Sequence, residues 1–364
     1  MAEETKKRKA DHIKICLEHK AQARKATTGL ENVHLVHKAL PEVNRAKIDL
    51  STAVFGYKFS APIIVGAMTG GTEEATKING AIAEAVEKLH LGMGVGSQRA
   101  AIEDKRLAKT FAVVRKKAPN AFLIANIGGV QLVHSYGAKE VKKAMDMINA
   151  DALAIHLNAL QEAVQPEGQT NFEGVLAKIA EMARALDKPV IVKETGAGIA
   201  AEEARKLETA GVKGIDVGGC GGTSFAAVEY FRVEHEEKRF LADVFWDWGI
   251  PTAASLVEVT QTVKIPVVAS GGLRTGTDIA KVLAIGACLA SVSQPILSSA
   301  VKSARETEKV LLRLTEELRN VMFLVGAKGV KDLARVPVVI TGETAQWLTN
   351  RDFKIESYAR RGAT

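Results

Sequence analysis

The sequence has few aromatic residues, few cysteines and no long apolar run. Phe, Trp and Tyr make up 5% of the 364 residues, too few for the stacking surfaces on which single-stranded nucleic acid binds. Cys16, Cys220 and Cys288 lie far apart, which disfavours a zinc site or a disulfide framework and suits a reducing compartment. No apolar run approaches the roughly 18 residues of a membrane span, and the N-terminus is polar. We therefore expect a cytoplasmic protein without a membrane or nucleic-acid partner.

The chain does carry a mild excess of positive charge. Lys and Arg number 49 against 42 Asp and Glu, which gives a formal net charge of +7. Hydrophobic residues make up 47% and charged residues 25%, a balance typical of a globular enzyme with a large core. A basic excess suits nucleic acid, anionic lipid or a small anion. Because aromatic residues are scarce, we favour a small anionic ligand.

Short apolar runs recur after residue 60 and alternate with alanine-rich amphipathic stretches. Nearly continuous apolar runs are typical of parallel strands that are buried on both faces. The predicted strands are 62–66, 92–95, 122–126, 152–157, 189–193, 213–217, 265–270 and 288–293. The predicted helices are 75–89, 104–117, 138–148, 173–186, 201–210, 277–285 and 299–325. This α/β alternation predicts a closed (β/α)8 TIM barrel, with an open doubly wound sheet as the alternative.

The remaining segments divide the chain into three parts. Residues 1–60 are predicted to form an N-terminal extension that caps the barrel, with a helix over 11–26 and an extended cap over the barrel bottom at 46–56. Residues 61–330 form the barrel. Residues 331–364 are predicted to be a C-terminal tail.

Two segments are candidates for mobility. The connection 218–248, after the sixth strand, is predicted to be a long loop, and such loops are often lids. Chain termini are loosely held unless other contacts fix them. We therefore expect residues 1–12 to be mobile when no substrate is bound.

Polar residues gather at the ends of the predicted strands. A barrel of this kind carries its chemistry at the C-terminal ends of its strands. The residues at these ends are Met68, Thr69, Ser97, Gln98, Arg99, Asn126, His156, Asn158, Gln161, Glu162, Lys193, Glu194, Asp216, Thr223, Ser270, Arg274, Ser293 and Gln294. The pattern predicts one site that draws on most of the strands.

The segment Gly271-Gly272-Leu273-Arg274 follows the seventh predicted strand. Glycines let backbone N–H groups approach a phosphate closely, and the N-terminus of the next helix favours an anion. Barrels often bind phosphate in the loops after strands seven and eight. The segment therefore predicts a phosphate site, with a plain turn as the alternative.

Lys193 ends a buried apolar strand, where an unpaired charge is costly. One interpretation is that it contacts the N1/O2 edge of a flavin and stabilises the anionic reduced ring. A Schiff-base lysine is a second interpretation. A structural ion pair with Glu194 or Asp216 is the third.

Arg8, Lys9, His12 and Arg99 are candidates for a cationic pocket that binds a diphosphate. Lysine and arginine both bind phosphate, and arginine does so with forked hydrogen bonds. Alternatively, the run that contains Arg8 and Lys9 is a solvated tail.

Three further residues of this rim have open interpretations. Glu162 is a candidate hard oxygen ligand for Mg²⁺, or simply a solvated loop carboxylate. His156 either binds substrate or packs in the core. Cys220 lacks a base beside it in the sequence, so that packing is a better interpretation than nucleophilic catalysis.

At these residues the sequence resembles the type 2 isopentenyl diphosphate isomerases over nearly its whole length. The resemblance rests on Arg8-Lys9-Ala10-Asp11-His12, Leu40-Pro41-Glu42, Ile48-Asp49-Leu50, Ala67-Met68-Thr69-Gly70-Gly71, Gly94-Val95-Gly96-Ser97-Gln98-Arg99, His156-Leu157-Asn158, Gln161-Glu162, Val192-Lys193-Glu194, Gly221-Gly222-Thr223 and Gly271-Gly272-Leu273-Arg274. One departure is Gly218-Gly219-Cys220, where the family usually has a serine-containing segment. That departure puts the cofactor contacts of this loop in doubt.

The resemblance implies an enzyme of isoprenoid biosynthesis that interconverts isopentenyl and dimethylallyl diphosphate with reduced FMN and Mg²⁺, with NADPH as reductant. It implies FMN binding by Ala67, Met68, Thr69, Ser97, Asn126, Lys193, Thr223, Gly271, Gly272, Arg274, Ser293 and Gln294. It implies substrate binding by Arg8, Lys9, His12, Ser97, Arg99, His156, Asn158 and Gln161. It also implies Glu162 as the metal ligand, Gln161 and Lys193 as catalytic residues, and a homo-tetramer or homo-octamer.

Two other functions remain as alternatives. A 2-hydroxy acid oxidase, also an FMN barrel, needs a histidine base near the flavin, but Ser270 leads directly into Gly271 here. A non-enzymatic barrel that binds a phosphorylated ligand or RNA is the second. Our hypothesis for the isomerase is a 1,3-proton shift through an allylic cation-like transition state, in which reduced flavin N5 donates and accepts the proton and Gln161 orients or relays it.

Overall fold

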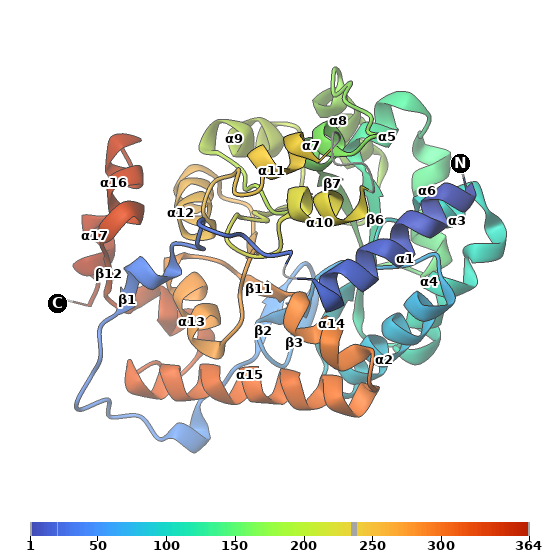
Figure 1. The fold of residues 1–364 in the computed structure, drawn as a ribbon. Coiled ribbons are helices and arrows are strands. Elements are labelled where there is room, and N and C mark those ends of the chain that lie inside the picture. Colours follow the sequence, from blue (N-terminus) through green and yellow to red (C-terminus); the bar gives the residue numbers. More distant parts are fainter. Residues whose placement is uncertain (1, 20, 234–238, 363–364) are drawn as a thin grey trace.

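A closed barrel of eight parallel strands forms the centre of the computed structural model, which describes residues 2–19, 21–233 and 239–362 (Figure 1). The strands are β4 (Ile63–Val65), β5 (Gly92–Gly94), β6 (Phe122–Gly128), β7 (Ala152–Leu157), β8 (Val190–Glu194), β9 (Gly214–Asp216), β10 (Val267–Ala269) and β11 (Leu289–Val292). Ile63 pairs with Ala290, so that β4 and β11 close the ring. Each of the eight predicted strands is confirmed, and closure rules out the open doubly wound sheet.

Helices surround the barrel and bury the outer faces of its strands. They include α2 (Glu73–Lys88), α4 (Lys109–Lys117), α6 (Ala138–Met147), α8 (Val175–Ala185), α9 (Ala201–Thr209), α12 (Thr252–Thr262), α13 (Gly276–Ile285), α14 (Gln294–Ala300) and α15 (Ala304–Leu324). Side-chain caps fix several starts: Thr72 accepts a hydrogen bond from the backbone of Ala75, and Thr275 accepts one from Asp278. Such caps satisfy N–H groups that have no partner inside the helix. In the described part of the chain, no helix is both long and apolar enough to cross a membrane.

An antiparallel hairpin covers the N-terminal end of the barrel, as the sequence predicts for this segment. It consists of β2 (Thr52–Val54) and β3 (Tyr57–Phe59). Phe59 is fully buried and packs with Phe122 of β6. This apolar plug closes the bottom of the barrel, so the opposite end is left for the site.

The connection after β9 is not the long loop that the sequence predicts. It contains α10 (Phe225–Arg232) and α11 (Phe240–Val244), while residues 234–238 of this segment lie outside the described residues. Ser224 caps α10, and its hydroxyl also donates to the backbone oxygen of Trp246. This segment is therefore a helical cover beside the C-terminal rim.

The N-terminal segment is a helix, α1 (Ala2–Glu18), rather than a loose arm. Its bounds differ from the predicted 11–26, and Ile13 and Ile15 are buried. It packs against α3 (Arg99–Glu103), α10 and α14, as Figure 1 shows. The expectation that residues 1–12 are mobile without substrate stays a prediction.

The C-terminal segment also has defined structure and is not a simple tail. Its strand β12 (Val338–Ile340) pairs antiparallel with β1 (Val33–Leu35), about 300 residues earlier, and is followed by α16 (Gly342–Asn350) and α17 (Glu356–Ala359). The division into 1–60, 61–330 and 331–364 remains our proposal, with the first and last parts paired through this two-stranded sheet.

Candidate active site

A cavity lies at the C-terminal end of the barrel and offers about 280 Å³ of space that water molecules can occupy. Every predicted site residue lines it. They are Arg8, Lys9, His12, Ala67, Met68, Thr69, Ser97, Arg99, Asn126, His156, Asn158, Gln161, Glu162, Lys193, Thr223, Gly271, Gly272, Arg274, Ser293 and Gln294. The fold therefore brings together side chains that are up to 286 positions apart in the sequence, from Arg8 to Gln294.

The corner between β10 and β11 has the properties of a phosphate site. Within the described residues, the backbone N–H groups of Gly271, Gly272 and Leu273 donate to no acceptor. Arg274 donates to the side chain of Gln294 and has no carboxylate within ion-pair distance in the described chain. Burial lowers the pKa of this guanidinium, which is the sign of a cation that is incompletely solvated. A phosphate would satisfy both the free donors and the charge, so these residues fit the phosphate of FMN.

The glycines of this corner have a second role that the sequence did not indicate. Gly271 and Gly272 have φ values of +103° and +74°, a region that side chains rarely allow. A Cβ on Gly271 would lie 2.1 Å from the backbone oxygen of Gly219, and a Cβ on Gly272 would lie 2.5 Å from the side chain of Thr28. These glycines therefore permit the close packing of neighbouring loops as well as access to an anion.

Lys193, His156 and Asn126 line one wall on neighbouring strands β8, β7 and β6, and Lys193 is paired in register with His156. The Lys193 ammonium donates to the backbone oxygen of Glu194 at 2.5 Å and forms no ion pair within 4 Å with any described carboxylate. The predicted alternative of a structural pair with Glu194 or Asp216 is therefore not formed. The ammonium is left with free donors beside the cavity.

His156 is a neutral hydrogen-bonding group in this wall. Its Nδ1 lies 2.8 Å from Oδ1 of Asn126. Burial, together with the charges of Lys193 and Lys9, lowers the pKa of His156 to about 3. It can therefore orient a ligand by hydrogen bonding near neutral pH, but it adds no positive charge.

The cationic corner contains Arg8, Lys9 and Arg99, which belong to α1 and α3. The Lys9 ammonium is buried and donates to the backbone oxygen of Ser97. Burial, followed by the charge of Arg8, lowers the pKa of Lys9 to about 7. Arg8 lies 3.7 Å from the carboxylate of Glu167. These residues form a cationic cluster in the cavity wall and not a solvated tail.

Glu162 is 5% exposed and accepts hydrogen bonds from Asn158, Gln165 and the backbone N–H of Gln169 at 2.7–3.0 Å. The solvated-loop interpretation is therefore wrong. Oδ1 of Asn158 is buried beside it without a hydrogen-bond partner in the described structure. No cluster of three metal-binding side chains occurs among the described residues. Hard oxygens from Glu162 and its surroundings fit Mg²⁺ only if ligand phosphates and water complete the shell, as is common for this ion.

Glu229, on α10, is a residue that sequence reasoning missed. It is completely buried and contacts three side chains: His12 at 3.1 Å, Gln161 at 3.0 Å and Arg232 at 2.6 Å. Burial acts to raise the pKa of Glu229, but His12 and Arg232 outweigh it and lower the value to about 2. The carboxylate is therefore ionised and holds the Gln161 amide at the cavity wall.

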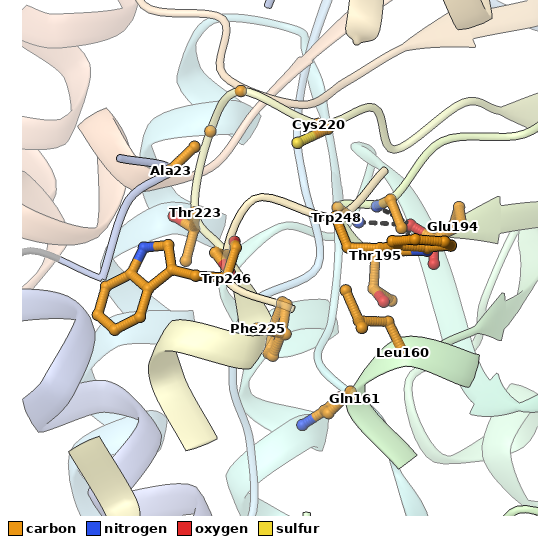
Figure 2. Close-up of a pocket in the computed structure, with 15 residues that line it drawn as sticks. Ala23, Leu160, Gln161, Glu194, Thr195, Cys220, Thr223, Phe225, Trp246 and Trp248 are labelled. Atoms are coloured by element: carbon orange, nitrogen blue, oxygen red, sulfur yellow. Dashed lines mark hydrogen bonds between the residues drawn. The ribbon is translucent and has the colours of Figure 1, made fainter. Parts of the chain in front are cut away.

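A smaller pocket adjoins the cavity, and Figure 2 shows its side chains, among them Trp246, Trp248 and Cys220. Glu194, at its edge, accepts hydrogen bonds from the backbone N–H groups of the turn that begins at Thr195. Burial raises the pKa of Glu194 to about 7. Cys220 is 4% exposed, and burial raises its pKa to about 11, which disfavours the thiolate, so packing stays the better interpretation for this residue.

The fold and the site together define a (β/α)8-barrel protein whose cavity has two cationic corners, one at Arg274 and one at Arg8, Lys9 and Arg99. The family model described as FMN-dependent dehydrogenase matches residues 1–112 and 142–339. In fold, the chain is similar to a mandelate oxidase mutant (TM-score 0.62, 19% identity, 86% of this chain and 90% of that chain). It is also similar to a lactate oxidase of Pediococcus acidilactici (TM-score 0.61, 19% identity, 88% of each chain).

The chain is 47% identical to an isopentenyl-diphosphate delta-isomerase of Methanosarcina barkeri, over 100% of this chain and 99% of the relative. It is 50% identical to one of Archaeoglobus fulgidus, over 95% of this chain and 99% of the relative. The chain belongs to the isopentenyl-diphosphate delta-isomerase family, within the FMN-dependent barrels. The predicted resemblance is thereby confirmed.

Proposed function

We propose that this protein interconverts isopentenyl and dimethylallyl diphosphate with reduced FMN and Mg²⁺. The observation that carries the proposal is the presence of two anion sites in one cavity: the corner of Arg274 and the corner of Lys9 and Arg99. The first accounts for the cofactor phosphate and the second for a substrate diphosphate. A cavity with one phosphate site would support FMN binding but would not explain the second cationic cluster.

Arg8, Lys9 and Arg99 would bind the diphosphate, and Glu162 would hold Mg²⁺, which when bound would offset negative charge on the phosphates. This remote binding positions the reacting carbons against the flavin. Lys193 stabilises negative charge at the N1/O2 edge of the bound cofactor, an electrostatic role of a preorganised group. Reduced FMN supplies the group that moves the proton in the 1,3-shift.

Gln161 orients the reacting end of the substrate. Its Nε2 donates to Glu229 and its Oε1 accepts from Asn158 at 3.2 Å. Because both ends of the amide are held, orientation is favoured over proton relay for this residue. His12 and His156 complete the polar wall by hydrogen bonding, and the backbone and side chains around Thr69, Ser97 and Thr223 contact the cofactor.

A 2-hydroxy acid oxidase activity is less well supported, although its members share the fold. Among the described residues, His12 and His156 are the histidines that line the cavity, and neither follows β10. A base for that oxidation would have to lie near the loop that begins at Ser270. We also propose NADPH as the reductant and assembly as a homo-tetramer or homo-octamer, on the basis of the family.

The test uses purified protein loaded with FMN and Mg²⁺, reduced with dithionite and given isopentenyl diphosphate. Formation of dimethylallyl diphosphate supports the proposal. A folded flavoprotein that forms none, or that is reduced by a 2-hydroxy acid instead, contradicts it.

We expect Arg274→Ala to weaken FMN binding by about 10- to 100-fold, because a charge-assisted hydrogen bond contributes about 1.5–3 kcal/mol. Quenching of flavin fluorescence on titration into the apoprotein measures this. Arg360→Ala, an exposed arginine on the C-terminal segment, is the matched control and should bind FMN normally. Equal affinity of the Arg274→Ala protein would remove this residue from the phosphate site.

The affinity for a diphosphate is expected to fall as the pH rises through about 7. Below its lowered pKa of about 7, Lys9 carries the charge that an anion needs, and above it the free protein holds a neutral amine. Binding of inorganic pyrophosphate, measured by calorimetry between pH 6 and 8.5, should show this dependence, apart from the titration of the ligand itself. In the Lys9→Gln variant the ligand still titrates, but the ammonium is absent. Its affinity for pyrophosphate should therefore depend less on pH. Identical profiles would show that Lys9 does not titrate in this range.

A further inference from the structure

Arg99 and Glu103 form an ion pair at the two ends of the short helix α3. The Nε atom of Arg99 donates to Oε1 of Glu103 at 2.8 Å. Within the described residues, the two terminal amino groups of Arg99 donate to no protein acceptor. The guanidinium thus lines the cavity with one edge occupied by Glu103 and the other edge unpaired.

The surroundings of the pair are enclosed. The side chains of Arg99 and Glu103 are 19% and 24% exposed, and α1 packs against α3. Tyr136 is 8% exposed, its hydroxyl has no partner in the described structure, and burial followed by the charge of Glu103 raises its pKa. Charges interact more strongly where water is scarce, so that this pair is better defined than an exposed i,i+4 pair.

We propose that Glu103 is a positioning residue for the diphosphate site: it holds the Nε edge of Arg99 so that the terminal amino groups are ready for phosphate oxygens. Arginine binds phosphate with two parallel hydrogen bonds, which requires a fixed orientation of its planar group. Without Glu103, the side chain would have to lose its rotamer freedom when the ligand binds. This inference rests on the proposed function, since it assumes a diphosphate at Arg99.

The negative charge of Glu103 also acts against ligand binding, because it repels the anionic ligand. Its carboxylate acts on the neighbouring ammonium of Lys9 in the other direction, since its charge favours the protonated form. The two effects predict opposite signs: preorganisation makes a Glu103 variant bind pyrophosphate more weakly, whereas simple repulsion makes it bind more tightly. The sign of one affinity change therefore decides between them.

The experiment measures the binding of inorganic pyrophosphate with Mg²⁺ to the FMN-loaded protein by calorimetry. We expect Glu103→Ala to weaken binding by about tenfold, the cost of ordering one long side chain. Glu103→Gln keeps an oxygen that accepts from Nε and should recover part of the loss. Glu306→Ala removes a carboxylate paired with Lys309 on the exposed face of α15 and should bind as the unsubstituted protein does.

A double-mutant cycle shows whether Glu103 acts through Arg99. In the Arg99→Ala background, Glu103→Ala should cause no further loss, which a general destabilisation of α3 would not reproduce. Unchanged or tighter binding by Glu103→Ala, or an equal loss in both backgrounds, overturns the inference. If the unsubstituted protein binds no pyrophosphate, the proposed function is contradicted as well. If the unsubstituted protein binds pyrophosphate and Glu103→Ala binds it equally well, the role of Glu103 is contradicted but the proposed function is not.

Discussion

Glu229→Gln is expected to lower kcat/KM for isopentenyl diphosphate by about 100-fold or more, although the substitution hardly changes the shape of the side chain. The carboxylate accepts hydrogen bonds from three donors, and a glutamine amide has only one accepting oxygen. The new NH₂ group would face the donors of Gln161 or Arg232. Each hydrogen bond to a charged group that is no longer made costs about 1.5–3 kcal/mol. The loss would affect Gln161, the residue that we propose orients the substrate.

FMN content and the binding of pyrophosphate serve as the controls for this variant. The side-chain contacts of Glu229 are with His12, Gln161 and Arg232. FMN binding should therefore be retained, and a loss in kcat would dominate over a rise in KM. Glu316→Gln is the matched control, since Glu316 pairs with Arg45 at an exposed position, and its turnover should be normal. Turnover by Glu229→Gln close to that of the unsubstituted protein would show that the contact with Gln161 has no role in the reaction.

Arg351→Ala is expected to reduce the free energy of unfolding by about 2–3 kcal/mol. Arg351 donates to Glu258 through Nε at 2.8 Å and through a terminal nitrogen at 3.0 Å. Glu258 is fully buried on α12, and Trp347 of α16 also donates to it. Removal of one partner from a buried pair usually costs about 3–5 kcal/mol, and the partial exposure of Arg351 lowers our figure.

Urea denaturation of the purified protein measures this change. In the double variant Arg351→Ala/Glu258→Gln, no unpaired charge is buried, so part of the lost stability should return. Arg360→Ala, on the exposed surface, is the control. An unchanged unfolding midpoint for Arg351→Ala would show that the C-terminal segment is not anchored through Glu258.

The barrel strands could be predicted from the sequence because their signal is local. Most of the strands are short apolar runs such as Val190-Ile191-Val192, and polar residues such as Lys193 lie at or soon after their ends. The carboxyl ends of parallel strands meet at one rim, so most of the predicted rim residues line the cavity. Gln98 and Asp216 are exceptions, because they are buried and are not among the residues that line it. The place of Arg274 in a phosphate site could likewise be predicted, because it follows Gly271 and Gly272 in the sequence.

Other features depend on contacts between distant segments and carry no local signal. Glu229 lies in an ordinary amphipathic helix, and its partners His12 and Gln161 are 217 and 68 positions away. The segment that contains α10 and α11 was predicted as a loop because these short helices are fixed by packing and caps, not by a long periodic pattern. The pairing of β1 with β12 spans nearly the whole chain.

The charge states of the site also required the structure. His156 and Lys9 have ordinary side chains in the sequence, but burial lowers the pKa of both, to about 3 and about 7. Burial is a property of the surrounding fold, so no motif encodes it. The cationic corner is therefore made by Arg8, Arg99 and a Lys9 that titrates, while the histidine only donates and accepts hydrogen bonds.

One cavity is expected to bind both reduced FMN and a diphosphate and to move a proton between two carbons of the substrate. The most direct measurement follows isopentenyl diphosphate in D₂O by NMR, with the same FMN- and Mg²⁺-loaded preparation in its oxidised and reduced states. We expect dimethylallyl diphosphate that carries deuterium to form with the reduced protein and at most a trace with the oxidised one. No product from the reduced, folded holoprotein would contradict the account, as would equal rates in both states.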